Sequence, residues 1–260
     1  MRNWFLQQEH GVRFEWGPTG AQQLASDAAC LVVVDVLSFT TSVTVAVEAG
    51  TQVFPYPWRD ETASAFAQNK VAALAVGRRA ATSASPWSLS PAALRQAPFT
   101  PRLVLPSPNG SAIAAAAGDS MVVAGCLRNA TAVGRWLARH GYGTAERPVV
   151  VIAAGERWPD GSLRPALEDL LGAGAIIAEL GSRGVGPLSP EAVAAQACFT
   201  QTADVVSAVA ACSSGVELVQ GGFADDVAIA TKLDASAIVP VLTDGAFHHS
   251  TDGTGPQPNL

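Results

Sequence analysis

The chain has 260 residues, enough for one large domain or two small ones, and 48% of them are hydrophobic while only 15% are charged. Because the formal net charge is -6 and no long basic run occurs, the sequence excludes an overall positive field that would attract nucleic acid or an anionic membrane surface. The charged fraction lies below the roughly 25% of an average soluble protein, which is compatible with a compact α/β body, with apolar surface covered in a homo-oligomer, or with a general bias towards alanine.

The sequence favours a soluble protein of the reduced cytoplasm. Its four cysteines lie far apart, without a CxxC pair or the spacing of a zinc finger. The N-terminal stretch MRNWFLQQEHG has three successive apolar residues, too few for the apolar core of a signal peptide. The longest apolar-biased region, residues 191–212, is interrupted by Gln196, Gln201 and Asp204, which would be costly in lipid. We therefore expect no membrane partner.

Strands and helices are expected to alternate along the chain. The β-branched run from Cys30 to Val36 predicts a strand buried on both faces, as in a parallel sheet. A helix over 42–49 follows, with Thr40 or Thr41 as its N-cap. Further strands are expected over 71–76, 103–105, 121–124 and 148–154, further helices over 111–117, 129–140, 167–180 and 190–211, and short closing segments over 226–232 and 238–242. The alternation predicts a layered α/β fold with a mixed or largely parallel sheet.

We expect one domain over residues 1–260, with two irregular regions. Residues 77–108 are rich in Ser, Pro, Arg and Trp and have weak periodicity, which predicts a long surface excursion that would suit a lid. The tail from about residue 244 has the composition of turns and is also expected to be irregular.

In parallel sheets ligands bind beyond the carboxyl ends of the strands, so polar residues that follow predicted strands are candidate site residues. Asp35 follows the first predicted strand and precedes a helix whose free N–H groups, with the hydroxyls of Thr40 and Thr41, would suit an anion. An equally good interpretation is that Asp35 caps a turn and that the threonines cap the helix.

Two further segments place polar groups after strands. Asn109, Gly110 and Ser111 form a turn into a helix; a plain turn is the commoner meaning of an Asn-Gly pair, but the same geometry builds an anion-binding nest of backbone amides. Arg128 and Asn129 present a guanidinium and an amide, which would bind phosphate or sulfonate oxygens. Asn129 would equally serve as an N-cap, and Arg128 as a solvated surface charge.

Carboxylates recur at the same predicted edge. Glu156 ends a strand, Glu168 and Asp169 open a helix, and Asp226 belongs to an acidic pair before a later helix. Adjacent acids at a helix start are favoured by the helix dipole alone. Beside Asp35, however, they would give an oxygen-lined cluster that suits Mg²⁺.

Several familiar chemistries are excluded by the sequence. It contains no GxxxxGK[ST] phosphate loop, no GxSxG nucleophile elbow, no CxxxxxR cysteine-phosphatase loop and no DxDx[TV] aspartyl-phosphatase motif. Its four histidines do not form the pattern of a zinc site or a catalytic triad.

The order of six motifs resembles that of the 2-phosphosulfolactate phosphatase (ComB) family, over residues 31–242. The motifs are VVVDVLSFTTSVTVAVEAG, SPNGSAIAAAA, GCLRNATAVGRWL, VIAAGE, LEDLLGAGAII and GGFADDVAIATKLDASAIVPVL. Each is weak alone, and their shared order carries the resemblance. It implies a three-layer α/β/α fold and a Mg²⁺-dependent phosphatase that acts on a small sulfonated, phosphorylated hydroxy acid.

On this resemblance we assign roles to individual residues. The catalytic residues would be Asp35, Glu168 and Asp169, and Mg²⁺ would be bound by the same three residues and Asp226. The small anionic phosphorylated substrate would be bound by Thr40, Thr41, Asn109, Gly110, Ser111, Arg128 and Asn129, with Arg78 or Arg79 as a further partner for its carboxylate or sulfonate.

The sequence departs from the family's pattern at two places. Ser38 stands where many members carry an arginine. The Gly-Glu-Arg and Gly-Asn-Ser-Pro stretches of the family are reduced to Arg78, at the position of the glutamate, and to a remnant at Ser90-Pro91. These departures bear on substrate identity and on activity, and not on the fold.

We therefore expect hydrolysis of 2-phosphosulfolactate to sulfolactate and phosphate. Two alternatives stand beside this expectation: a phosphatase of the same fold that acts on another small phosphorylated acid, and a non-catalytic descendant that binds an anionic metabolite.

Overall fold

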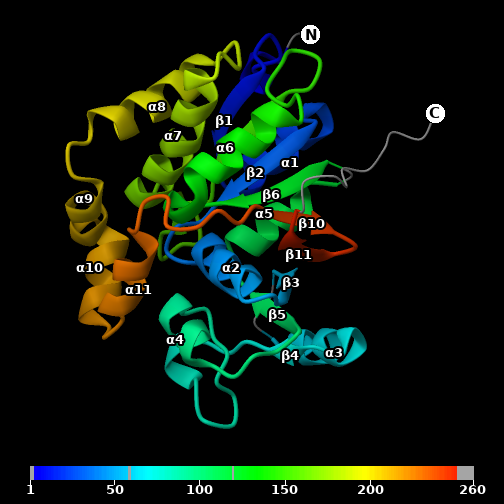
Figure 1. The fold of residues 1–260 in the computed structure, drawn as a ribbon, viewed down its shortest axis with the longest axis vertical. Helices are drawn as coiled ribbons and strands as arrows, with labels where there is room; N and C mark the ends of the chain where they lie inside the picture. The colour runs from blue at the N-terminus through cyan, green and yellow to red at the C-terminus, as the bar shows by residue number, and fades with distance from the viewer. Residues whose placement is uncertain (1–2, 58–59, 119, 251–260) are drawn as a thin grey trace.

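The structure, a computed structural model, describes residues 3–57, 60–118 and 120–250 (Figure 1). These residues form a nine-stranded mixed sheet in the order β1-β7-β2-β6-β10-β11-β3-β5-β4, beside a two-stranded ribbon of β8 and β9. The strands are β1 (Val12–Trp16), β2 (Cys30–Val34), β3 (Gln52–Tyr56), β4 (Ala73–Leu74), β5 (Arg102–Pro106), β6 (Met121–Gly125), β7 (Val149–Ala153), β8 (Glu156–Arg157), β9 (Leu163–Arg164), β10 (Pro240–Thr243) and β11 (Ala246–His249).

Helices connect most of the strands. The α-helices are α1 (Gly17–Leu24), α2 (Phe39–Glu48), α3 (Glu61–Lys70), α4 (Pro91–Gln96), α5 (Gly110–Ala116), α6 (Ala130–Arg139), α7 (Leu167–Ser182), α8 (Pro190–Gln201), α9 (Val205–Ala211), α10 (Ser213–Gln220) and α11 (Ala224–Ala230). Short 3-10 helices are η1 (Trp4–Leu6), η2 (Ala25–Asp27), η3 (Arg78–Ala80) and η4 (Leu127–Asn129).

Helices cover both faces of the sheet, which gives a three-layer α/β/α fold. All five residues of β2 are buried, because β7 and β6 flank it in parallel and helices pack on both of its sides. Its side chains alternate between the faces: Val32 packs with residues of α6, α7 and α8, while Val33 packs with residues of α1, α2 and α5. The prediction of a fully buried strand in a mixed sheet is confirmed.

The sheet consists of two parallel groups that run in opposite directions. The group β1-β7-β2-β6 is joined to the group β3-β5-β4 through the hairpin of β10 and β11, and all three joining pairings are antiparallel. A sheet twists by roughly 20–25° per strand, so the five steps from β2 to β5 rotate the strands by roughly 100–125°. The rotation offsets much of the reversal, and the loops after β2 and β5 meet: the N–H of Gly110 donates to the carboxylate of Asp35 at 3.0 Å.

The tail differs from its predicted irregular form. Residues 246–249 form β11, which pairs with β10 and with β3 inside the sheet. Phe247 is fully buried and contacts Phe39 edge to face, with ring centroids 6.3 Å apart. The prediction was wrong because a strand of only four residues between turn-forming segments has no clear pattern in the sequence. The rest of the predicted tail, 251–260, lies outside the described residues.

Other differences from the sequence predictions are local. The helix expected over 190–211 is divided into α8 and α9, because the carboxylate of Asp204 caps α9 by accepting from the N–H of Ser207 at 2.9 Å. The strand expected over 71–76 is reduced to the two residues of β4. The excursion 77–108 contains η3 and α4 beside β5, which includes the strand expected over 103–105, and the two helices make it more regular than expected.

None of the helices among the described residues combines the length and the apolar character that crossing a membrane requires. The four cysteines are free thiols.

Phe247→Ala should lower the free energy of unfolding by about 3–5 kcal/mol, the usual cost of emptying a buried aromatic position. Urea unfolding followed by circular dichroism measures the change. Thr243→Ala, at an exposed position of β10, is the matched control and should cost less than about 1 kcal/mol. Equal costs for the two variants would contradict the placement of β11 in the core.

Candidate active site

Asp35 joins the loops that follow β2 and β5. Its Oδ1 accepts a hydrogen bond from the N–H of Phe39 at 3.0 Å, and its Oδ2 accepts from the N–H of Gly110 at 3.0 Å. Only glycine fits at position 110, because a Cβ there would lie 2.2 Å from Phe39 Cδ1 and 2.9 Å from Asp35 Oδ2. The buried carboxylate therefore holds two strand ends together.

Asp169, in the first turn of α7, holds the ends of β2 and β7 together by hydrogen bonds. Its Oδ1 accepts from the N–H of Val36 at 2.7 Å, and its Oδ2 accepts from the N–H of Gly155 at 2.8 Å. Each of these two aspartates thus has its oxygens aimed at backbone amides of the strand-end loops. The expectation that Asp35 and Asp169 lie together at one edge of the sheet agrees with this geometry.

Two glutamates complete what we call the acidic cluster: Asp35, Glu156, Glu168 and Asp169. Glu168 is 2% exposed, and its Oε2 accepts from the thiol of Cys212 at 3.1 Å. Glu156, in β8, accepts at Oε2 from the side-chain amide of Asn109 at 3.2 Å. The cluster gathers carboxylates from the ends of β2 and β7 and from the start of α7.

Burial and mutual repulsion disturb the protonation of the cluster. Burial is the largest cause that raises the pKa of Asp35, and hydrogen bonds from Phe39 and Gly110 oppose it. Burial, followed by the charges of Glu168 and Asp35, raises the pKa of Asp169 well above its usual range. Burial, followed by the charges of Asp35 and Glu168, raises the pKa of Glu156 to about 7. Arg78 lowers the pKa of Asp35 and Arg164 lowers that of Glu156, but neither charge offsets the effect of burial.

A hard divalent cation fits the chemistry of these donors. Mg²⁺ is usually bound by one or two carboxylates together with water and substrate phosphate, so it does not need a cage of protein ligands. Among the described residues, no three acidic, histidine or cysteine side chains are arranged around one point as a ready-made set of ligands. The acidic cluster would thus offer carboxylate oxygens to Mg²⁺ without enclosing it.

Asp226 does not belong to the acidic cluster. Its Oδ2 accepts from Nε of Arg78 at 3.0 Å, and its Oδ1 accepts from the hydroxyl of Ser90 and from the N–H of Ala92 at 3.1 Å. Both oxygens, which the sequence assigned to metal binding, are directed at protein donors, as those of Asp35 and Asp169 are, but here one donor is a guanidinium that already supplies positive charge. Arg78 also donates to the hydroxyl of Ser38, whereas its neighbour Arg79 is exposed.

The hydroxyl groups assigned to substrate binding are turned towards the backbone. Thr40 donates to the carbonyl of Asp35 at 2.8 Å, Thr41 to that of Val36 at 2.8 Å, and Ser111 to that of Leu105 at 3.3 Å. The threonines were expected to cap α2, but the helix already begins at Phe39 and both lie within its first turn. They brace the loop after β2.

The side chains of Arg128 and Asn129 form their hydrogen bonds with residues outside the acidic cluster. Arg128 is buried at the far end of α2, where it donates to Glu48 at 3.3 Å and to the carbonyl of Ile229 at 3.4 Å. The side chain of Asn129 donates to the carbonyls of Ala124 and Ile238, and so ties the end of β6 to the segment before β10. The structure gives both residues partners within the protein.

Sequence reasoning left three neighbours of the site without a role. Glu156 carried a usable signal, because it follows a predicted strand and a glycine. Ser90 was noted only as part of the Ser90-Pro91 remnant of a family stretch, and Cys212 carried no signal. Their places follow from tertiary packing of α10 and α4.

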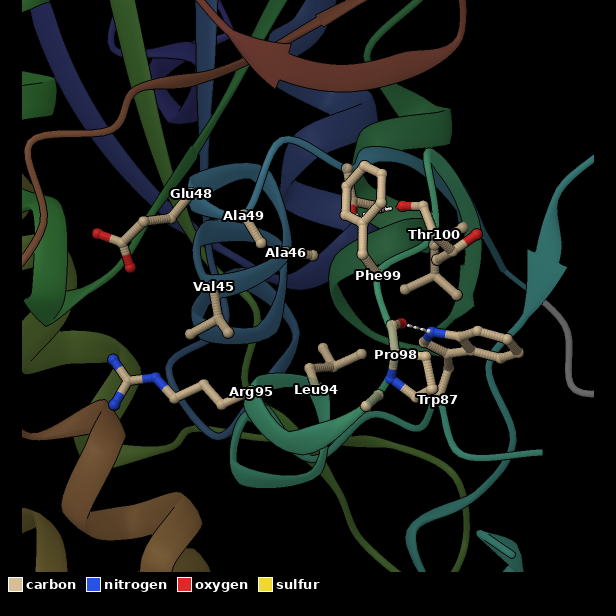
Figure 2. A pocket seen from close by; sticks show the side chains of 13 residues that line it. Val45, Ala46, Glu48, Ala49, Trp87, Leu94, Arg95, Pro98, Phe99 and Thr100 are labelled. Carbon is tan, nitrogen blue, oxygen red and sulfur yellow. Dashed lines mark hydrogen bonds between the residues drawn. The ribbon is translucent and has the colours of Figure 1, made fainter. Parts of the chain in front are cut away.

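Figure 2 shows a pocket of about 290 Å³ between the second half of α2 and residues 87–100. Val45, Leu94 and Phe99 contribute largely apolar walls, which suit a phosphorylated anion poorly. A different pocket, of about 230 Å³, includes Asn109 and Glu156 in its lining. The second pocket is the one that borders the acidic cluster.

Glu156→Gln should make the stability of the metal-free protein less dependent on pH. Because the pKa of Glu156 is raised from 4.5 to about 7, the folded state binds more protons than the unfolded chain between these values, and stability falls as pH rises through this window. Across this window the contribution of Glu156 to the free energy of unfolding falls by on the order of 2–3 kcal/mol.

Urea unfolding at about pH 5 and about pH 8, in EDTA, measures the loss in wild type and variant. Glu217→Gln, at an exposed position of α10, is the control and should keep the wild-type pH dependence. The same pH dependence in Glu156→Gln as in wild type would contradict the raised pKa.

Comparison with known proteins agrees with the geometry. A family model described as 2-phosphosulpholactate phosphatase matches residues 18–245, a range that contains the whole acidic cluster. A comparison with curated proteins finds no match. Phosphatases of this kind are phosphoric monoester hydrolases, and a match over most of the length shows the family. The chain belongs to the 2-phosphosulpholactate phosphatase family.

Proposed function

We propose that the protein hydrolyses 2-phosphosulfolactate to sulfolactate and inorganic phosphate with the help of Mg²⁺. The observation that carries this proposal is the acidic cluster, in which burial, followed by repulsion between the carboxylates, raises the pKa values of Asp35, Glu156 and Asp169. A phosphate monoester and a divalent cation bring charges of both signs, and their joint binding suits a site of this kind.

Asp35, Glu168 and Asp169 are the residues proposed to hold Mg²⁺. When bound there, the ion would supply positive charge to the phosphate oxygens and would relieve the repulsion between the carboxylates. The aspartates are already fixed by backbone hydrogen bonds, so their orientation does not depend on the ion.

Backbone donors support phosphate binding beside Asp35. Among the described residues, the N–H groups of Leu37 and Ser38 donate to no protein acceptor. They lie in the loop between Asp35 and α2, at the positive end of the helix. This arrangement offers two amide donors to phosphate oxygens, in place of the hydroxyls of Thr40 and Thr41 that the sequence suggested.

Glu156 would act as the general acid during hydrolysis. The reaction adds the oxygen of water to phosphorus and breaks the bond to the hydroxy-acid oxygen, which needs a proton as it leaves. In the metal-free protein burial is the main cause that raises the pKa of Glu156 to about 7, so its carboxyl group is suited to donate that proton and to be restored by a proton from the attacking water. The amide of Asn109 holds its carboxyl group at the edge of the pocket.

Asp35→Asn should lower phosphatase activity by at least about 100-fold, the scale of removing one charged group from a preorganised site. Phosphate release from 2-phosphosulfolactate, phospholactate and an aryl phosphate, with Mg²⁺ and with EDTA, measures the effect. Asp160→Asn, which changes an exposed aspartate, is the control and should keep wild-type turnover.

Thermal unfolding of the Asp35→Asn variant shows whether its fold is retained. Full activity in a folded variant would overturn the role of Asp35. Turnover by the wild type that EDTA leaves unchanged would overturn the role of Mg²⁺, and preference for phospholactate would point to another phosphorylated acid.

A further inference from the structure

Asp226 is a single buried carboxylate that connects three segments far apart in the sequence. It lies on α11, is 1% exposed, and accepts hydrogen bonds from Arg78, Ser90 and the N–H of Ala92. Arg78 belongs to η3, while Ser90 and Ala92 form the start of α4, which packs against α11 (Figure 1). One side chain therefore fixes both ends of the segment 78–90.

Arg78 carries the connection on to the loop of Asp35. Its Nε donates to Asp226 and its Nη2 donates to the hydroxyl of Ser38, three residues after Asp35. Its side chain is 17% exposed, and among the described residues its Nη1 has no acceptor. An arginine fork that is held at one edge by a carboxylate presents its remaining N–H groups in a defined direction.

The charge balance at Asp226 differs from that of the acidic cluster. Asp226 and Arg78 form a pair whose charges cancel, so a cation is not needed there. The free edge of Arg78, by contrast, would face an anion beside the phosphate position near Leu37 and Ser38. A substrate that carries a carboxylate or sulfonate next to its phosphate supplies such an anion.

We infer that Asp226 is a positioning residue, which holds Arg78 towards the second anionic group of the substrate and does not bind the metal. The inference rests on the proposed function and deepens it. On this inference Arg78, held by Asp226, makes the enzyme select a phosphorylated acid over a phosphate ester without a second anionic group.

Asp226→Asn distinguishes the contact with Arg78 from the contacts with Ser90 and Ala92. The remaining amide oxygen can still accept from Ser90 and Ala92, whereas the new NH₂ group would face the Nε of Arg78, and two donors repel. Arg78→Gln removes the guanidinium itself. Matched controls are Asp225→Asn and Arg135→Gln, which make the same chemical changes at exposed positions outside the site.

Steady-state kinetics with 2-phosphosulfolactate and with p-nitrophenyl phosphate, which has no second anionic group, test the inference. We expect Asp226→Asn and Arg78→Gln to raise KM for 2-phosphosulfolactate by at least about tenfold and to change the kinetic constants for p-nitrophenyl phosphate by less than about threefold. The Mg²⁺ concentration for half-maximal activity should stay as in wild type. The control variants should behave as wild type with both substrates.

Two outcomes would overturn the inference while the proposed function stands. Equal losses for the two substrates would show that Asp226 only supports the fold. A tenfold or larger rise in the Mg²⁺ requirement of Asp226→Asn would show that it acts on the metal.

Calorimetric titration of sulfolactate and of inorganic phosphate, both with Mg²⁺ present, separates the inference from the proposed function. Weaker binding of sulfolactate to Asp226→Asn, with phosphate binding unchanged, supports the inference even if wild type hydrolyses none of the esters. Hydrolysis by wild type with equal sulfolactate affinity in both proteins supports the function and overturns the inference. If wild type neither binds sulfolactate nor hydrolyses the esters, both fail.

Discussion

The hydrogen bonds from backbone amides to the carboxylates of Asp35 and Asp169 are the constraint on which the rest of the site depends. Each aspartate receives two such bonds, and the four amides belong to loops that follow β2, β5 and β7 or begin α2. The strand ends are therefore held together by negative side chains rather than by apolar packing. This arrangement concentrates negative charge, because the carboxyl groups of Glu156 and Glu168 lie beside those of the two aspartates. A site built in this way carries more carboxylates than cationic side chains, which favours ligands that bring positive charge.

The shape of the sheet explains how distant segments meet in one site. Two parallel groups of opposite direction would ordinarily send their carboxyl ends to opposite edges. Twist accumulated across β6, β10, β11 and β3 brings the loop after β5 to Asp35 and the loop after β4 to Ser38. The positions at which the sequence departs from the family's pattern, Ser38 and Arg78, are in contact as a result. A guanidinium thus stands beside the loop of Asp35, although it comes from a different segment of the chain.

Much of the central fold was predictable, because β2 and its neighbours carry strong local signals. A short, continuous β-branched run favours a strand buried on both faces, and its position before Asp35 located the edge of the sheet that carries the site. The strand β11 was not predictable, since its four residues gain their strand character from pairing with β10 and β3 and not from their own composition. The roles of Thr40 and Asp226 could not be predicted from the sequence for a similar reason. A hydroxyl or a carboxylate at a strand end shows that polar chemistry is present, but only tertiary packing decides whether it faces a ligand or a backbone amide.

The hairpin of β10 and β11 lies between the two groups of strands and follows all their strands in the sequence. Each group can pair its own strands as soon as they are synthesised, but the two groups share no direct pairing across the sheet until residues 240–249 have been made. The angle between the groups, and with it the approach of the loop after β5 to Asp35, is set at that moment. A nascent chain in which every acidic residue of the cluster has already been made would therefore still have an incomplete site until this hairpin joins the sheet.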